Sequence, residues 1–303
     1  MKRLAERARV VAAIASFFES RDFLRVETPA VVPSPGMDAH LDAFGVDLGA
    51  RGRRFLATSP EYQMKRLLAD GFPRIYQLCK AYRRDEEGHL HNPEFSMLEW
   101  YRARASVEDV MRDTEQLVAR VTGGAIRAGG ATITTLPPFP RVTVLEAFER
   151  FAGRDERETL AMAEHEEELF FRLLIEKVEP GLATLGSAVF LTDYPACMAS
   201  LARKKPGDPR VAERFELYAA GVELCNGFGE LVDPIEQRAR FVADQAARAE
   251  RGAEVYPIDD KLIEALGRLE PAAGNALGVD RLAMLACGAS SIGEVIAFGW
   301  GEL

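Results

Sequence analysis

Two arginines that lie far apart in the sequence could together bind a polyanion. Arg83 stands in the run RRDEEGHLHNP, and Arg281 ends the run GNALGVDR. A guanidinium group offers a rigid fork of hydrogen-bond donors that matches phosphate, so the two could hold the ends of a triphosphate. Taken alone, each arginine is weak evidence, because a surface arginine is by far the more common case. Gly274 and Gly278 match neither common phosphate loop, and they either admit another group close to the backbone or form a structural turn.

Three glutamates spaced seven residues apart could bind a metal ion. Glu216, Glu223 and Glu230 lie in RFELYAAGVELCNGFGEL, a segment of strand character. Magnesium prefers carboxylate oxygens and is usually shared with substrate phosphates, so two of these glutamates could hold the metal of a nucleotide. A solvated strand edge is the alternative interpretation.

A third group of residues could bind an ammonium ion. The runs RIYQLCKAYR (74–83) and EFSMLEWYRA (94–103) are joined by a polar loop, which predicts an antiparallel hairpin. Because side chains alternate between the two faces of a strand, Glu99 and Tyr101 share one face with apolar neighbours. A carboxylate and a phenol in such a setting suit a cationic group.

Apolar periodicity, capping residues and turn residues predict the elements that must position these groups. Apolar side chains at helical spacing predict a helix over 4–21. The prolines of LRVETPAVVPSPG predict an edge strand followed by a loop, and GNALGVDR is interpreted as a Gly-rich turn before a helix. A second helix is expected at 59–71, with Ser59 as N-cap, Pro60 in the first position and Gly71 at the end. Further helices are expected at 106–121, at 144–153 after a Thr143–Glu146 capping box, and at 155–180. Strands are expected at 54–58, 188–195 and 214–224.

The composition is that of an ordinary globular protein. The 303 residues are 48% hydrophobic and 28% charged, which allows a sizeable core in a single unit. A net charge of -9 argues against broad nucleic-acid binding, and four scattered cysteines suggest neither a zinc site nor a disulfide framework. No sequence window is apolar enough to span a bilayer and the N-terminus is unlike a signal peptide, so we expect a cytoplasmic protein without membrane contact.

Together and in this order, these features resemble the three motifs of a class II aminoacyl-tRNA synthetase catalytic domain. RVETPAVV with Pro29 resembles motif 1, AYRRDEEGHLHNPEFSMLEWY resembles motif 2, and GNALGVDR resembles motif 3. The words SPEYQMKRLL, ELCNGFGEL and LGVDRLAML are similar to the lysyl branch. The chain looks as if it lacks the OB-fold domain that grips the anticodon in lysyl-tRNA synthetases. It therefore best resembles the truncated paralogues that attach β-lysine to a lysine side chain of elongation factor P, and Ala276, where lysyl-tRNA synthetases usually have glycine, supports this.

The resemblance implies a fold and a reaction. The fold would be α+β, a mainly antiparallel sheet flanked by helices, in one domain over 1–303 with a Gly/Pro-rich connection near 122–141. Two copies would form a homodimer through the motif 1 region. Lysine or β-lysine and ATP, with magnesium, would give an aminoacyl adenylate and pyrophosphate, and elongation factor P would be the acceptor, with no stable binding of tRNA.

The resemblance also implies roles for individual residues. Arg83 would hold the α-phosphate and Arg281 the γ-phosphate of a bent ATP, which makes these two the catalytic residues. The motif 2 acid that would contact the adenine ring is usually glutamate, and here it is Asp85, which is one methylene shorter. Either a backbone shift or a water molecule would restore the contact, or Glu86, otherwise a solvated residue, would take the place of Asp85. ATP would also contact Arg84, Asn92, Glu223, Leu224 and Gly278, magnesium would bind Glu216 and Glu223, and the amino acid would contact Ser59, Pro60, Glu61, Glu99, Tyr101, Asn226, Glu230 and Ala276.

Two other functions stay open at this point. The chain could be a lysyl-tRNA synthetase-like enzyme acting on tRNA or a free amine, or a non-catalytic regulatory module that holds an amino acid in a synthetase pocket. The presence of Arg83, Arg281, Glu216 and Glu223 argues against the silent module, because all four are dispensable for simply holding lysine.

Overall fold

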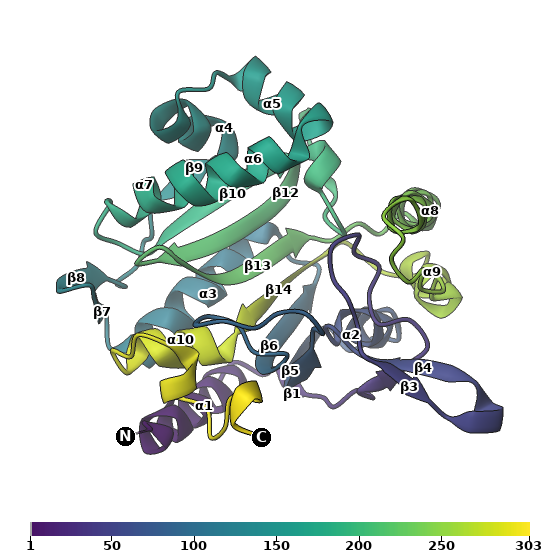
Figure 1. Ribbon diagram of the computed structural model, residues 1–303, viewed down its shortest axis with the longest axis horizontal. Helices are drawn as coiled ribbons and strands as arrows, with labels where there is room; N and C mark the ends of the chain where they lie inside the picture. Colours follow the sequence, from purple (N-terminus) through teal and green to yellow (C-terminus); the bar gives the residue numbers. More distant parts are fainter. Residues whose placement is uncertain (1) are drawn as a thin grey trace.

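The computed structural model describes residues 2–303, and a nine-stranded, mainly antiparallel sheet forms its centre (Figure 1). The strands follow the order β1-β5-β6-β14-β13-β12-β10-β9, and β11 pairs with β12. The edge strands β1 and β9 pair in parallel with their neighbours, whereas the other pairs are antiparallel. This confirms the predicted α+β class. The strands are β1 (Leu24–Arg25), β5 (Arg74–Tyr82), β6 (Glu94–Ala103), β9 (Arg141–Thr143), β10 (Val189–Pro195), β11 (Lys204–Lys205), β12 (Asp208–Ala219), β13 (Val222–Gly229) and β14 (Ala272–Gly278).

Three helices cover one face of the central strands: α1 (Leu4–Glu19), α3 (Val107–Thr122) and α10 (Val279–Ala286) (Figure 1). The apolar residues that predict the first helix are buried, and Phe18 packs on Trp100 of β6 with 5.3 Å between ring centroids. The reciprocal Ser106–Asp109 capping box fixes the start of α3. With this face occupied by the core, the opposite face of β6, β13 and β14 is free to line a site.

A second group of elements lies beside this sheet. Helices α2 (Glu61–Ala69), α8 (Pro234–Glu250) and α9 (Asp260–Leu266) pack together, next to a small sheet of β2 (Val31–Val32), β4 (Arg53–Leu56) and β3 (Gly45–Asp47) (Figure 1). Helix α2 begins at Glu61, so the expected start at Pro60 is early by one residue. Ser59 Oγ nevertheless accepts a hydrogen bond from the Glu61 amide at 3.0 Å, and Gly71 with φ 96° follows the helix as expected.

A unit of short helices covers β9, β10 and β12: α4 (Val144–Ala147), α5 (Glu156–His165), α6 (Glu167–Leu173) and α7 (Glu179–Ala183) (Figure 1). The capping box of Thr143 and Glu146 is confirmed. The prediction of a single helix over 155–180 is wrong. The backbone leaves the helical region at Glu166, with φ −137° and ψ 52°, and a wide π-type turn at Leu174–Val178 precedes α7, where Pro180 is tolerated in the first turn.

The Gly-rich turn expected at GNALGVDR is also wrong. Residues Ala272–Gly278 form β14, which is hydrogen-bonded to β6 on one side and to β13 on the other. Two flanking strands supply the pairing that a glycine-rich segment does not favour on its own. The expected close approach does occur at Gly274, where an added Cβ would lie only 2.2 Å from Tyr101 Cδ1.

The Gly/Pro-rich segment 122–141 holds a small hairpin of β7 (Ala125–Ala128) and β8 (Ala131–Thr134). The large sheet takes strands from both sides of this segment. Within residues 2–303, the helices are all too short or too polar to cross a membrane.

Candidate functional site

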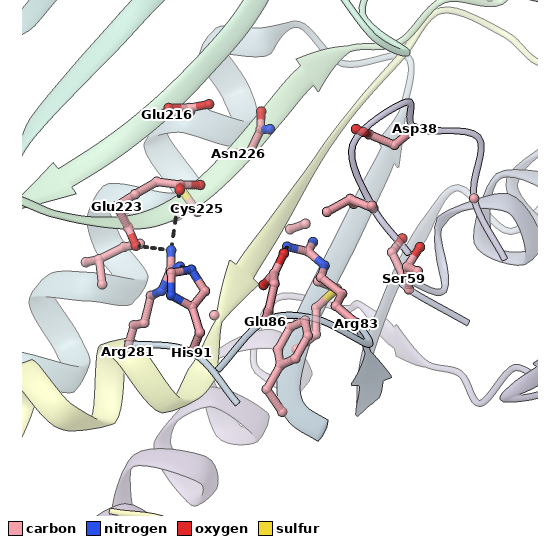
Figure 2. Close-up of a pocket in the computed structure, with 18 of the residues that line it drawn as sticks. Asp38, Ser59, Arg83, Glu86, His91, Glu216, Glu223, Cys225, Asn226 and Arg281 are labelled. Carbon is pink, nitrogen blue, oxygen red and sulfur yellow. Dashed lines mark hydrogen bonds and ion pairs between the residues drawn. The ribbon is translucent and has the colours of Figure 1, made fainter. Parts of the chain in front are cut away.

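A cavity of about 460 Å³ opens on the face of the sheet that the core helices leave free (Figure 2). Strands β6, β12, β13 and β14 form its floor and sides, and the loops at 35–41 and 83–92 border it. Most of the residues predicted from the sequence line it: Ser59, Glu61, Arg83, Asn92, Glu99, Glu216, Glu223, Leu224, Asn226, Ala276, Gly278 and Arg281.

Arg281 enters the cavity from the first turn of α10 and is held by two segments. Its Nη1 lies 2.9 Å from the Glu223 carbonyl oxygen and 3.3 Å from Glu223 Oε2. Its Nη2 lies 2.6 Å from His91 Nε2 (Figure 2). Burial and the neighbouring guanidinium lower the pKa of His91, so the ring stays neutral and Nε2 can accept this hydrogen bond. The guanidinium is thus positioned in advance, as anion binding requires.

Glu216 and Glu223 come from the paired strands β12 and β13 and both face the cavity (Figure 2). Glu216 is oriented by Arg214 at 2.7 Å and by the hydroxyl of Tyr218 at 2.7 Å. Burial, and then the like charge of Glu216, raise the pKa of Glu223 to about 7. Two carboxylates that repel each other beside a basic cluster form a donor set that fits magnesium. Residues 2–303 contain no cluster of three or more His, Cys, Asp or Glu side chains suited to a metal.

Arg83 reaches the cavity from the end of β5. Its guanidinium lies over the Phe95 ring, 5.2 Å from the centroid, and its Nη1 lies 3.3 Å from Glu86 Oε1. Figure 2 shows Glu86 beside Arg83 at the cavity wall. The structure therefore places Glu86 in the cavity, where the sequence interpretation favoured solvent.

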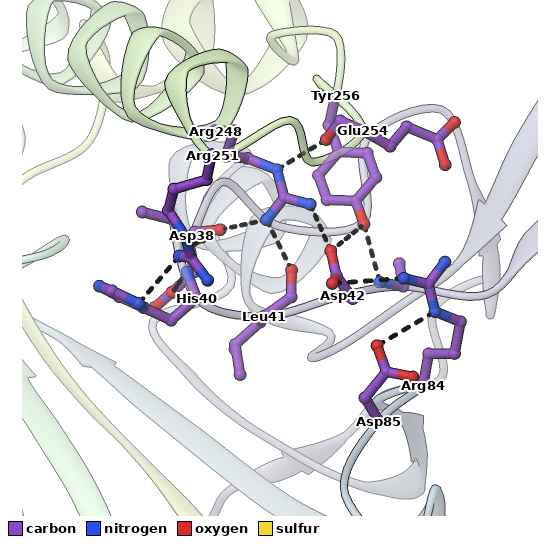
Figure 3. A network of polar contacts seen from close by, with 12 residues as sticks. Asp38, His40, Leu41, Asp42, Arg84, Asp85, Arg248, Arg251, Glu254 and Tyr256 are labelled. Atoms are coloured by element: carbon purple, nitrogen blue, oxygen red, sulfur yellow. Dashed lines mark hydrogen bonds and ion pairs between the residues drawn. The ribbon is translucent and has the colours of Figure 1, made fainter.

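Arg84 and Asp85 turn away from the cavity into a different network (Figure 3). Arg84 lies 3.3 Å from both Asp42 Oδ2 and Asp85 Oδ2, and 69% of the Asp85 side chain is exposed. Arg248, which is fully buried, holds the same loop: it donates to the carbonyl oxygens of Asp38 and Leu41, each at 2.8 Å. The structure does not bring Arg84 and Asp85 together with the other predicted ATP-binding residues.

A buried acidic cluster lies at the end of the cavity near α2; Glu61 and Glu99 line the cavity, whereas Tyr101 and Glu230 are not among its lining residues. Glu99 and Glu230 are each only 1% exposed, and Glu99 Oε2 accepts a hydrogen bond from the Tyr101 hydroxyl at 2.8 Å. Burial, followed by the charge of Glu61, raises the pKa of Glu99 to about 8. Burial raises the pKa of Glu230 to about 7, although the ammonium group of Lys65 opposes this. Carboxyl groups whose pKa is raised by burial are suited to an ammonium ligand, because the nearby positive charge would favour their ionised form.

The remaining predicted residues stand between these two ends. Asn226 and Ala276 are partners on β13 and β14, and Leu224 lies further along β13. The Asn92 amide is engaged by the chain itself: Nδ2 donates to the Glu94 carbonyl at 2.6 Å, and Oδ1 accepts from the Trp300 amide at 2.8 Å. Pro60 is buried at the start of α2.

The sequence interpretation missed Lys65, His91 and Arg214. Lys65 appears in SPEYQMKRLL as one more polar helix residue, and its partner Glu230 is remote in the sequence. Arg214 precedes Glu216 by two positions on one strand, and this alternation was the available signal. His91 could be found only through its contact with Arg281.

The whole arrangement can hold a polyphosphate with a divalent ion at one end and an ammonium group at the other. Comparison with known proteins agrees with this. The sequence profile of the family "tRNA synthetases class II (D, K and N)" matches residues 1–300. Proteins called elongation factor P–(R)-β-lysine ligase are similar over nearly the full length of both chains. The one from Vibrio atlanticus (strain LGP32) is 40% identical, covering 98% of this chain and 95% of the relative; the one from Vibrio vulnificus (strain YJ016) is 42% identical with the same coverage; and the one from Klebsiella pneumoniae (strain 342) is 40% identical, covering 97% and 94%.

Proposed function

The chain belongs to the class II aminoacyl-tRNA synthetase family, and on this premise we propose that it activates lysine with ATP and transfers it to elongation factor P. β-Lysine is the proposed isomer. In the first step a carboxylate oxygen of the amino acid attacks the α-phosphorus, and the bond between the α- and β-phosphates breaks. The products are the aminoacyl adenylate and pyrophosphate.

The arginines and glutamates at the nucleotide end supply charge and alignment for this step. Arg83 would contact the α-phosphate, on which negative charge is redistributed, and Arg281 the γ-phosphate. Glu216 and Glu223 would hold magnesium, which offsets the charge of the phosphates. Asn92, Leu224 and Gly278 would contact the nucleotide, and Glu86 is a better candidate than Asp85 for the nucleotide base because it lies in the cavity.

The residues at the other end would select the amino acid. Glu99, Tyr101 and Glu230 would receive the distal ammonium group, and Ser59 and Glu61 would face the other amino group. Asn226 and Ala276 would lie along the carboxylate end. In the second step an uncharged amine of the acceptor attacks the acyl carbon, an amide bond forms, and AMP leaves.

One observation supports this proposal most directly. Glu61 and Glu99 of the buried carboxyl cluster line the same cavity as Arg83 and Arg281. A nucleotide site alone would not need Glu99 and Glu230, each 1% exposed. A site that only holds lysine would not need Arg281 and Glu223.

Pyrophosphate exchange tests the first step. Purified protein is incubated with ATP, magnesium, labelled pyrophosphate and, in turn, α-lysine and the two β-lysine enantiomers. We expect exchange with at least one isomer, and exchange with none of them would refute the activity. The loaded enzyme is then offered elongation factor P and total tRNA side by side. Label that appears only on tRNA would overturn the proposed acceptor.

Arg281→Ala tests the site. It should abolish exchange and leave the circular dichroism spectrum unchanged, because Arg281 lies on the cavity wall and not in the core. Near-normal exchange would refute the proposed contact with the γ-phosphate. Lys205→Met is a control for the loss of a cationic side chain: Lys205 Nζ lies 2.7 Å from Asp193 Oδ2, and Lys205 is not among the residues that line the cavity.

We further propose a cytoplasmic homodimer joined through the motif 1 region, with one catalytic domain per chain and no stable tRNA complex. The support is family membership. Sedimentation velocity would test it: a species of one chain's mass, or one that sediments with tRNA, would contradict it.

A further inference from the structure

A lysine of the chain itself is built into the acidic end of the cavity. Lys65 lies on α2 and its side chain is 1% exposed. Its Nζ is 2.7 Å from Glu61 Oε1 and 2.6 Å from Glu230 Oε2, so one ammonium group bridges two carboxylates from segments remote in sequence. Burial lowers the pKa of Lys65, but Glu230 and Glu61 more than offset this and raise it to about 12. Lys65 therefore stays charged.

This internal cation does not complete the cluster. Within residues 2–303, the buried atom Glu99 Oε1 and both carboxylate oxygens of Glu230 have no hydrogen-bond partner, although Glu230 Oε2 lies within ion-pair distance of Lys65 Nζ. Both carboxyl groups are 1% exposed, and water cannot easily satisfy them there. Three carboxyl groups, of Glu61, Glu99 and Glu230, thus share the charge of Lys65. Glu99 and Glu230, whose pKa values are raised to about 8 and about 7, therefore hold protons near neutral pH, and an ammonium group supplied by a ligand would displace these protons.

The position of Lys65 decides where that second ammonium group can bind. Glu61 and Lys65 are four residues apart on α2, so their pair is part of one rigid helix. The contact with Glu230 ties this helix to the end of β13, and the free oxygen Glu230 Oε1 lies near Gly274 of β14, 2.8 Å from where a Cβ would be. With Glu230 Oε2 engaged by Lys65, the other oxygen is left for the ligand.

We propose that Lys65 is a positioning residue for substrate selection: it occupies one of two cation places in the acidic cluster, so that the other accepts a single distal ammonium group between Glu99 and Glu230. This inference rests on the proposed activation of lysine. It predicts a selected class of amino acids, those with one ammonium group at the end of an unbranched side chain. Neutral side chains would leave Glu99 and Glu230 unbalanced and would be rejected.

A purely structural ion pair is the competing explanation, because Lys65 also joins α2 to the end of β13. Removal of a structural pair would lower the melting temperature and impair all ligands alike. Removal of a positioning cation would act on the amino acid alone. Separate KM values for lysine and ATP therefore distinguish the two explanations.

The test uses Lys65→Met, which keeps the approximate length of the side chain. If this variant does not fold, Lys65→Gln replaces it, because glutamine still donates hydrogen bonds. In pyrophosphate exchange we expect the KM for lysine to rise roughly thirtyfold, the lower end of the cost of breaking a buried charge pair, with the KM for ATP within about twofold. Lys65→Arg, which keeps the charge, should recover part of the loss. The control Lys205→Met removes a half-exposed pair and should change neither value.

A smaller variant adds a direct test of the vacant place. Lys65→Ala should be partly restored by millimolar propylammonium or butylammonium, and not by the uncharged alcohols of the same length. An unchanged KM for lysine in a folded variant, or equal increases for lysine and ATP, would overturn this inference alone. Absence of exchange by the unaltered protein would remove the proposed function and this inference with it.

Discussion

Replacement of Gly274 by alanine would test whether the shape of β14 creates the ammonium site. The new methyl carbon would lie 2.2 Å from Tyr101 Cδ1 and 2.8 Å from Glu230 Oε1, whereas ordinary contacts begin at 3.4 Å. The Tyr101 ring or the strand must therefore retreat by roughly 1 Å. Tyr101 is 3% exposed and packs in the core cluster with Tyr62 and Ile75, which leaves the ring little room.

Two effects of different size should follow. Overpacking of this kind costs about 1–3 kcal/mol in the free energy of unfolding. The Tyr101 hydroxyl, now 2.8 Å from Glu99 Oε2, would be displaced together with the ring. Since a misplacement of about 1 Å can reduce a rate by about a hundredfold, kcat/KM for lysine should fall by that order. The loss of activity would thus exceed what partial unfolding explains.

Urea unfolding, followed by circular dichroism, and lysine-dependent pyrophosphate exchange measure the two effects. Gly267→Ala is the matched control, because Gly267 has φ −64° at the end of α9 and the nearest atom to its added Cβ is 3.6 Å away. It should be neutral or slightly stabilising. A Gly274→Ala protein with kcat/KM for lysine within about threefold of the unaltered enzyme would refute the steric argument.

Three further predictions concern protonation, the cavity loop and the metal. The pKa of Glu99 is raised to about 8, and only its carboxylate form pairs with an ammonium group, so binding of lysine must release a proton below that pH. The KM for lysine should therefore fall as pH rises from 6 to 8, by up to about tenfold per pH unit, and a flat profile would contradict this. Arg248→Met should lower the free energy of unfolding by about 3–5 kcal/mol in urea titrations, because it leaves the carbonyl oxygens of Asp38 and Leu41 without their hydrogen-bond donor. A loss below about 1 kcal/mol would show that the network is dispensable. Chelation of magnesium should stop exchange reversibly, and Glu223→Gln should raise the half-saturating magnesium concentration by about tenfold or more; an unchanged magnesium titration would remove Glu223 from the metal site.

The sequence predicts the parts of the fold that local patterns determine. Alternation in 74–83 and 94–103 predicts the β5–β6 hairpin and places Glu99 on the cavity face, as the structure shows. Apolar spacing predicts α1, and the side-chain and backbone bonds of Thr143 and Glu146 confirm a local capping motif. These features depend on neighbours a few residues away, so one segment carries the whole signal.

What escaped prediction depends on segments that meet only after folding. The strand character of β14 comes from β6 and β13, because its glycines do not favour a strand by themselves. The direction of Asp85 is set by Arg84, which pairs with Asp42 of a distant loop. Lys65 and Glu230 form an ion pair although they are 165 positions apart in the sequence, and no spacing rule links them. Long-range contacts of this kind are specified by the fold and not by local sequence.

The floor of the cavity can be made shallower by substitution far more easily than it can be made deeper. Gly274, Ala276 and Gly278 occupy alternate positions of β14, and Ala276 and Gly278 line the cavity, so this side of the strand is almost bare backbone. Any substitution there other than glycine at 276 adds volume and makes the cavity shallower. An engineer who wants the enzyme to accept a bulkier amino acid gains at most one methyl group from the floor. Larger substrates must instead be accommodated at the walls, for example at Asn226 or Met37, where side chains remain to be shortened.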